Sequence, residues 1–205
     1  GSDTLTVYAA ASTDLDAVVG VETINIVLDD INSYTALVAT SGSDGIEIAT
    51  TINFSGGKAG QVYTISQVLD DVALRTIDST ALTGSIDLVF GNDGLKVTDS
   101  NDMVTIKGGS GTADVLRTEN TGNTTGDFTM SGIETLIIGN ETAASTVSLK
   151  NVTGLNEVQL TDHAGTVKGV TFTNVANNSQ FQLGNATDEF EGGDADLTVT
   201  LADAT

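Results

Sequence analysis

The fold of this chain is decided by a pair of motifs that occurs twice. One copy is Ala113-Asp-Val-Leu-Arg117, followed by Gly132-Ile-Glu-Thr-Leu-Ile-Ile138. Near the start, Ser2-Asp-Thr-Leu-Thr6 and Gly20-Val-Glu-Thr-Ile-Asn-Ile26 repeat the same order. The aspartates stand at positions 3 and 114, which are 111 apart, and the glutamates at 22 and 134, which are 112 apart. Matching order and spacing indicate an internal repeat.

We therefore predict two related units, residues 1–107 and residues 108–205. Each unit holds several strand-turn rungs of about 20 residues, which is the size of a solenoid turn. Period-two alternation of apolar residues is typical of half-buried strands, and the Gly, Asn, Asp and Ser between them favour turns. Examples are Leu5–Tyr8, Glu22–Leu28, Gly45–Phe54, Met103–Lys107, Glu134–Ile138, Thr146–Lys150, Val170–Thr173 and Leu197–Leu201.

This pattern predicts an all-β fold, a parallel β-solenoid of stacked strand-turn rungs. A narrow solenoid core favours Val, Ile, Leu and Ala, in agreement with an aromatic content of 4%. Pro, which removes a donor from a strand ladder, does not occur. The alternative is a pair of β-sandwich domains of about 100 residues each, although such domains usually contain a core Trp. One window, Ile65–Ile77, has the spacing of a helix.

Composition and charge exclude several classes of protein. The 205 residues include 28 Asp and Glu against 7 Lys and Arg, which gives a formal net charge of −21. Such a chain repels nucleic acid, so we expect no nucleic-acid partner. The absence of Cys excludes disulfides and thiolate metal sites. No apolar run reaches the roughly 18 residues of a membrane span, so we expect no membrane insertion.

A glycine-rich stretch, Gly108-Gly-Ser-Gly-Thr-Ala-Asp-Val-Leu116, carries the clearest chemical signal. It matches the calcium-binding nonapeptide G-G-x-G-x-D-x-U, with one residue inserted before the Asp. Calcium takes six to eight oxygens at about 2.3–2.6 Å. Glycines allow sharp turns that point carbonyl oxygens inward, and the Asp supplies charge. We predict a calcium loop of Gly108, Gly109, Gly111 and Asp114; an ordinary glycine-rich turn is the alternative.

Three further acidic turns follow the same logic. Gly1-Ser-Asp-Thr-Leu5 resembles the tail of the nonapeptide, so Asp3 is a candidate half-site. Gly91-Asn-Asp-Gly94 offers Asp93. Gly192-Gly-Asp-Ala-Asp-Leu197 offers two carboxylates beside glycine, which makes Gly193, Asp194 and Asp196 candidates. Each of these turns is otherwise a solvated surface turn.

Taken together, the Gly-Gly-x-Gly-x-x-Asp-Val-Leu order and the later Gly-Ile-Glu-Thr-Leu resemble RTX-type surface-layer proteins of Gram-negative bacteria. Gly20-Val-Glu-Thr-Ile-Asn-Ile26 and Leu201-Ala-Asp-Ala-Thr205 are similar to their rungs. The resemblance implies a calcium-dependent β-solenoid, secreted by a type I system, that forms a lattice on the cell exterior. It also implies neighbouring copies of the same protein as partners and contact with cell-surface polysaccharide through other regions. One near-complete loop, where such repeats usually run in tandem, is a departure from the family pattern.

Little in the sequence indicates catalysis, and we expect a structural protein rather than an enzyme. The single His, His163, lies in a polar turn beside Asp162, and two sequence neighbours do not make a catalytic triad. Two other functions stay open: a calcium-binding stalk or adhesin module of a large RTX protein, and a carbohydrate-active β-helix enzyme. Because the chain begins with Gly1-Ser2 and no leader, we interpret it as a piece of a longer extracellular protein.

Overall fold

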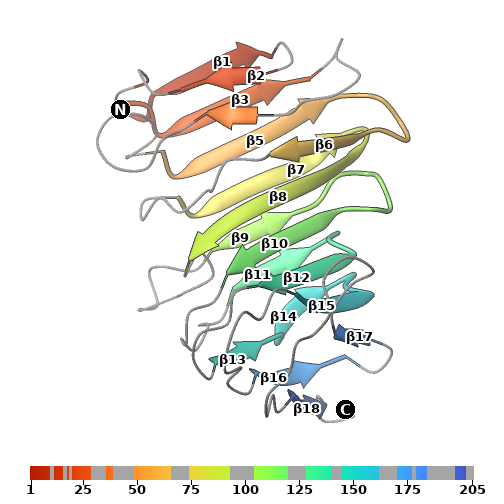
Figure 1. The fold of residues 1–205 in the computed structure, drawn as a ribbon. Coiled ribbons are helices and arrows are strands. Elements are labelled where there is room, and N and C mark those ends of the chain that lie inside the picture. The colour runs from red at the N-terminus through yellow and green to blue at the C-terminus, as the bar shows by residue number, and fades with distance from the viewer. Residues whose placement is uncertain are drawn as a thin grey trace.

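The structure is a computed structural model that describes residues 1–9, 12–15, 18, 20–28, 36–38, 49–65, 74–92, 104–119, 128–139, 145–161, 170–176, 179–183 and 197–201. In these ranges every regular element is a β-strand (Figure 1). None of them contains a helix, and so none contains a helix that could span a membrane.

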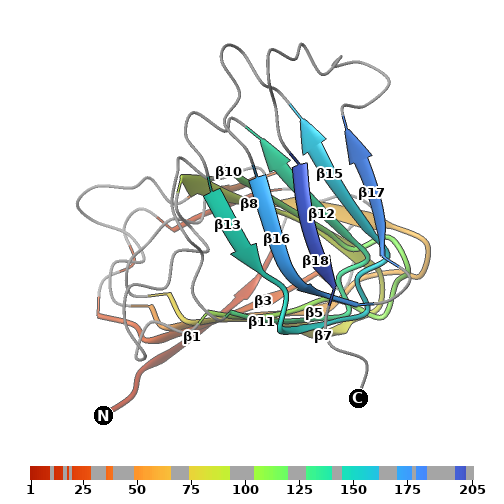
Figure 2. The same ribbon diagram turned by 90° about the horizontal axis from the view of Figure 1, so that it is seen from below.

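The largest sheet has seven parallel strands, and each strand comes from a later position in the chain than the last. Its strands are β1 (Thr4–Tyr8), β3 (Thr23–Val27), β5 (Thr51–Gly56), β7 (Thr76–Leu82), β9 (Thr105–Lys107), β11 (Thr129–Ser131) and β14 (Asn151–Thr153). Figure 2 looks along the stack, where strands of this sheet overlap one another.

A six-stranded parallel sheet forms the second wall. In spatial order its strands are β17 (Gln180–Leu183), β15 (Glu157–Thr161), β12 (Thr135–Gly139), β10 (Val115–Glu119), β8 (Ser85–Asn92) and β6 (Val62–Ile65). Two smaller parallel sheets complete the described strands. They are β13 (Ser145–Ser148), β16 (Val170–Val175) and β18 (Leu197–Leu201) in one, and β2 (Ser12–Asp14) with β4 (Ala36–Val38) in the other.

This arrangement confirms the predicted parallel β-solenoid. The chain passes from one wall to the other and returns one strand further along, as Figure 1 shows from β5 through β12. The ladder β7–β9–β11 runs through residue 107 without a break, because β9 pairs in parallel with both neighbours. Strand pairing is thus continuous where the sequence repeat divides; the division into two units stays a prediction.

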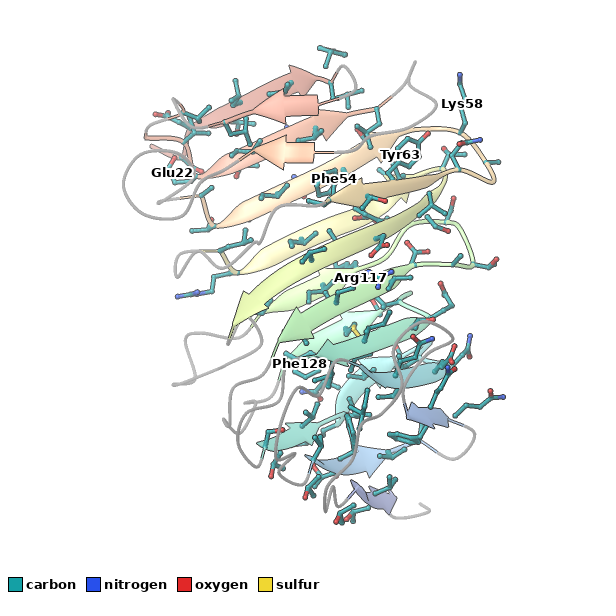
Figure 3. All side chains as sticks on the ribbon, in the orientation of Figure 1. Glu22, Phe54, Lys58, Tyr63, Arg117 and Phe128 are labelled. Carbon is teal, nitrogen blue, oxygen red and sulfur yellow. The ribbon has the colours of Figure 1, made fainter. Side chains whose placement is uncertain are left out.

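The core consists of apolar columns that the parallel register creates. In the large sheet, register places Ile24, Ile52, Ile77, Ile106 and Met130 in one line, and each is fully buried. In the second wall, Ile65, Leu88, Leu116, Leu136 and Val158 form the corresponding line. Figure 3 shows Phe54 and Tyr63 in the upper half of the stack and Phe128 lower down. The parallel register places apolar side chains of similar size above one another, which is why the Ile-, Leu- and Val-rich pattern suits this fold.

The helix predicted for Ile65–Ile77 is wrong at both ends. Ile65 closes β6 and Ile77 lies in β7, and both side chains are fully buried in the core. Residues 66–73 lie outside the described residues. Both ends of this window are inward-facing strand residues, so their burial follows from the stacking of rungs and not from one face of a helix.

Ion pairs join neighbouring rungs on the outer faces, and two of them lie between described strands. Lys107 Nζ lies 2.8 Å from Asp78 Oδ2, between β9 and β7. Arg117 donates from Nε to Asp87 Oδ1 at 2.8 Å and from Nη2 to Asp87 Oδ2 at 3.0 Å, between β10 and β8. Lys107 and Asp78 are register partners, whereas Arg117 reaches diagonally to Asp87, and each cation thus pairs with a carboxylate one rung away.

Candidate cation site at the glycine-rich corner

The glycine-rich loop connects β9 to β10 and forms a corner between the two large sheets. Its backbone binds the rungs on both sides. Gly108 N donates to Ser131 O at 2.8 Å, and Gly111 N donates to Gly84 O at 3.1 Å. The corner therefore holds three successive rungs together through main-chain hydrogen bonds.

The three loop glycines are required because the neighbouring rungs come too close for a side chain. A Cβ on Gly108 would lie 1.7 Å from Gly132 O, and one on Gly109 would lie 2.3 Å from Gly84 O. A Cβ on Gly111 would lie 1.9 Å from Ser85 Oγ. In this structure the glycines thus allow successive rungs to stack closely. The sequence predicted that their carbonyl oxygens bind calcium, and that role stays a prediction.

Asp114 is the buried acid of the corner, with 0% of its surface exposed. Its Oδ1 accepts hydrogen bonds from Gly109 N at 2.7 Å and from Ile86 N at 2.9 Å. Its Oδ2 is also buried, and no N–H group among the described residues donates to it. The Asp114 carboxyl group also lies within side-chain hydrogen-bonding reach of the Glu134 carboxyl group.

Glu134 of the next rung stands directly beside Asp114. Asp114 N donates to Glu134 Oε2 at 2.9 Å, and in return Glu134 N and Thr135 N donate to Asp114 O at 3.0 and 3.1 Å. Burial raises the pKa of Asp114, although the N–H donors of Gly109 and Ile86 oppose this shift. Burial also raises the pKa of Glu134, and the charge of Asp114 raises it further. Two neighbouring carboxyl groups with raised pKa values indicate a site that a positive charge would stabilise.

The N-terminal copy of the motif forms the same corner in an exposed setting. Asp3 N donates to Glu22 Oε2 at 2.7 Å, and Thr23 N donates to Asp3 O at 3.1 Å. The hydrogen bond from Asp3 N lowers the pKa of Glu22. Asp3 is exposed to solvent, whereas Asp114 is not. Both copies of the repeated motif therefore form the same hydrogen bond, from the backbone N–H of the Asp to the carboxylate of the Glu. The first copy forms it at the surface and the second at the buried corner.

The glycine that precedes each glutamate by two residues explains the rest of the repeat. Gly20 has a φ of +75° and Gly132 a φ of +62°, in the left-handed region that only glycine enters readily. This conformation turns the chain so that the following strand, β3 or β12, enters its sheet. The two copies nevertheless fall in different sheets, because β3 belongs to the seven-stranded sheet and β12 to the six-stranded one.

The remaining candidates can now be placed. Gly108, Gly109, Gly111 and Asp114 lie together in the corner, and Asp3 lies at the exposed copy. Asp93, Gly193, Asp194 and Asp196 lie outside the described residues, as does His163. Glu134 was not among the predicted metal ligands. Its position in the repeat, equivalent to that of Glu22, was the feature of the sequence from which its place beside Asp114 could have been predicted. Among the described residues, no three Asp, Glu or His side chains gather around one point.

The donor set suits a hard cation in part. Carboxylate oxygens are the ligands that calcium prefers, and no N–H group among the described residues donates to the buried Oδ2 of Asp114. The two N–H groups that hold Oδ1 repel a cation, so Oδ2 and the Glu134 carboxyl are the side-chain groups left to hold it. Comparison with protein-family models, curated proteins and solved structures finds no match for this chain.

Proposed function

We propose that this chain is a structural, non-enzymatic segment of a bacterial surface-layer protein that assembles on the cell exterior and is stabilised by calcium. The fold supports this proposal because a parallel solenoid is a rigid rod whose ends present strands, and such ends are suited to stacking. The resemblance of the repeated motifs to RTX-type surface-layer proteins supports it as well. The net charge of −21 suits a calcium-rich exterior, where a weak affinity of about 10⁻⁴–10⁻³ M suffices.

One observation carries the proposal: the terminal rungs leave inward-facing apolar side chains only partly covered. Leu5 and Val7 of β1 are half-buried, whereas Ile24 and Ile26, their partners on β3, are fully buried. At the other end Val199 of β18 is 38% exposed, although its partner Phe172 is fully buried. In the described part of the chain, β1 and β18 each pair with a strand on one side only. A further rung would cover these positions and extend the ladder, whether it is supplied by a neighbouring molecule or by another part of the longer protein, and the assembly proposal assigns it to a neighbouring molecule.

The outer face of the large sheet favours the second candidate, a stalk or adhesin module. Register places six threonines in one line along that face, so that a regular polar strip follows the rod. A sugar or another repeating surface could bind such a strip without end-to-end assembly. The six residues are Thr4, Thr23, Thr51, Thr76, Thr105 and Thr129.

Light scattering of the purified chain separates the two functions. In millimolar calcium we expect the mass to rise with protein concentration, and a Val7→Lys variant to remain monomeric because its charge would lie inside the junction. Thr6→Lys, on the outer face of the same strand, is the matched control and should still assemble. Monomers under all conditions would contradict the lattice proposal and favour the stalk. Far-UV circular dichroism checks that both variants keep the β-sheet content of the parent chain.

A further inference from the structure

The outer face of the seven-stranded sheet carries two lines of residues without net charge, in a chain whose formal net charge is −21. The first line is formed by the six threonines, and the second runs parallel to it. The residues of the second line are Thr6, Asn25, Asn53, Asp78, Lys107, Ser131 and Thr153. Asp78 and Lys107 are the charged residues of these two lines, and their charges cancel. Depletion of charge is typical of surface that becomes buried between proteins.

We propose that this face binds a second copy of the same chain, with the two rods side by side and pointing in opposite directions. A two-fold axis parallel to the strands, between β7 and β9, relates the two copies. This inference rests on the assembly part of the proposed function and deepens it: the rod ends join copies in one direction, and this face joins them across that direction. The contact involves no calcium ion.

The first argument is the order of the two charges along the face. In a two-fold contact, a residue of one copy meets a different residue of the other, and the same pair forms a second time. An axis between β7 and β9 places Asp78 opposite Lys107 of the second copy. Within one copy Lys107 Nζ lies 2.8 Å from Asp78 Oδ2, and the two side chains remain 41% and 24% exposed. The contact therefore joins two ion pairs into a cluster of four alternating charges.

The second argument is the match of period. Neighbouring strands lie about 4.7–4.9 Å apart, and two copies share this repeat because they share one fold. The axis places Thr76 opposite Thr105 of the second copy. It likewise places Thr51 opposite Thr129. A hydroxyl group both donates and accepts hydrogen bonds, so threonine can pair with threonine. A sugar polymer whose repeat differed by about 0.5 Å would be about 2.5 Å out of register after five strand spacings.

The third argument is that the face is open and its side chains are already ordered. The six-stranded and three-stranded sheets both lie on the inner side of the seven-stranded sheet (Figure 2). Along the second line, Asn53 Nδ2 donates to Asn25 Oδ1 at 2.8 Å, and Asn25 Nδ2 donates to Thr6 Oγ1 at 3.4 Å. Side chains that are held in this way lose less conformational entropy when a partner binds.

The size of the face decides how strong the contact is. With β7 opposite β9, the strands from β3 to β14 each have a counterpart, whereas β1 has none. The paired part measures about 29 Å along the rod and about 12 Å across it, or roughly 350 Å² per copy. A total near 700 Å² belongs to the weak class of protein contacts.

A weak contact has two consequences for assembly. Single segments stay apart in dilute solution, which agrees with the monomer expected for Val7→Lys. Rods that are joined end to end pair through many such contacts at once, so the lateral contact strengthens as the rods grow. Thr6 belongs to β1, outside the paired part, and Thr6→Lys therefore leaves the lateral contact intact.

Cross-linking tests the arrangement, because the chain contains no Cys of its own. Thr51→Cys and Thr129→Cys are each made in the Val7→Lys background, which blocks the end junction. Packed faces lie about 10 Å apart, within reach of a short bismaleimide, whereas the two Thr51 positions are also displaced by three rungs, about 14 Å. At millimolar concentration of the chain, an equal mixture should give about fivefold more cross-linked dimer than either variant alone, because effective concentration falls with distance. Thr135→Cys, on the outer face of the six-stranded sheet, replaces Thr51→Cys in the matched control for random encounters.

Reversal of the charges gives a second readout. Lys107→Asp places like charges opposite each other and should lower the cross-link yield of the mixture to that of the control. Adding Asp78→Lys to the same chain restores opposite charges across the axis and should restore the yield. A variant that had merely lost its structure would not be rescued in this way. Far-UV circular dichroism checks that each variant keeps its β-sheet content.

Three results would overturn the inference. A mixture that cross-links no more than the Thr135→Cys control would show that the face does not bind a second copy, and would leave it to a sugar. Thr51→Cys alone cross-linking as well as the mixture would indicate rods that point in the same direction. A yield unchanged by Lys107→Asp would exclude the charged pair from the contact. Because the ends are blocked, each of these results is distinct from a failure of end-to-end assembly, which light scattering of the parent chain measures.

Discussion

Replacing Gly108 by Ala tests whether the loop glycines exist to bring successive rungs together. The new Cβ would lie 1.7 Å from Gly132 O, whereas ordinary contact begins at 3.4 Å, so the two rungs must separate locally by about 1.7 Å. Movement of that size breaks the 2.8 Å hydrogen bond from Gly108 N to Ser131 O. Overpacking costs about 1–3 kcal/mol and a lost hydrogen bond about 0.5–1.5 kcal/mol. We therefore expect Gly108→Ala to lower the free energy of unfolding by about 2–4 kcal/mol.

Urea denaturation followed by circular dichroism measures this loss as a lower midpoint with an unchanged slope. Ser110→Ala is the matched control, because Ser110 is exposed in the same loop and its substitution should change stability by less than about 0.5 kcal/mol. The loss should be of the same size in chelator and in calcium, since the clash involves backbone only. A Gly108→Ala protein as stable as the Ser110→Ala control would refute the argument. A loss seen only in calcium would refute it as well, and would restore Gly108 as a ligand.

Two further predictions concern the core and the outer face. Phe128→Ala removes a fully buried ring and should lower the free energy of unfolding by about 3–5 kcal/mol in the same assay; a loss below 1 kcal/mol would contradict the burial of Phe128. Burial acts to raise the pKa of Asp78, but the hydrogen bonds from Lys107 and Thr80 outweigh it, so this pKa lies below its ordinary value of 3.8. The ion pair therefore stabilises the fold above pH 3.8 and loses its effect as pH falls through the folded-state pKa. Because both partners are partly exposed, Asp78→Asn should cost only about 0–1 kcal/mol at pH 7, and urea midpoints measured from pH 7 to pH 3 should converge with those of the parent chain.

The architecture could be predicted from the sequence because the alternation within each strand and the repetition from strand to strand indicate the same fold. Alternation puts Ile24 and Ile26 on the inner face of β3, and the next rung repeats it with Ile52 and Phe54 on β5. Parallel stacking is the arrangement that lets such repeats cover one another, so the solenoid followed from periodicity and turn residues. The helix predicted at Ile65–Ile77 failed for the same reason: rung spacing, not helical spacing, brings its ends into the core.

The site was predicted only in part. Asp114 and its glycines stand out by composition, and they do lie in one corner. Glu134 lies twenty residues after Asp114 in the sequence, but the fold places it in the next rung, where its carboxyl group accepts a hydrogen bond from Asp114 N. Its part in the site depends on this closeness in space. Equal spacing in the repeat linked the two residues but could not say which copy is buried.

By itself, the sequence determined that the chain forms stacked parallel strands, where its turns fall, and that its Asp–Glu motif occurs twice. These properties depend on alternation and on glycine at positive φ, which act within a few residues. Only the tertiary structure decided that one copy lies in water and the other in the core, because burial depends on which rungs stack above and below. That difference gives Asp3 and Asp114 opposite surroundings from the same motif: the Asp3 residue is exposed to water, and the Asp114 carboxyl group is buried beside that of Glu134.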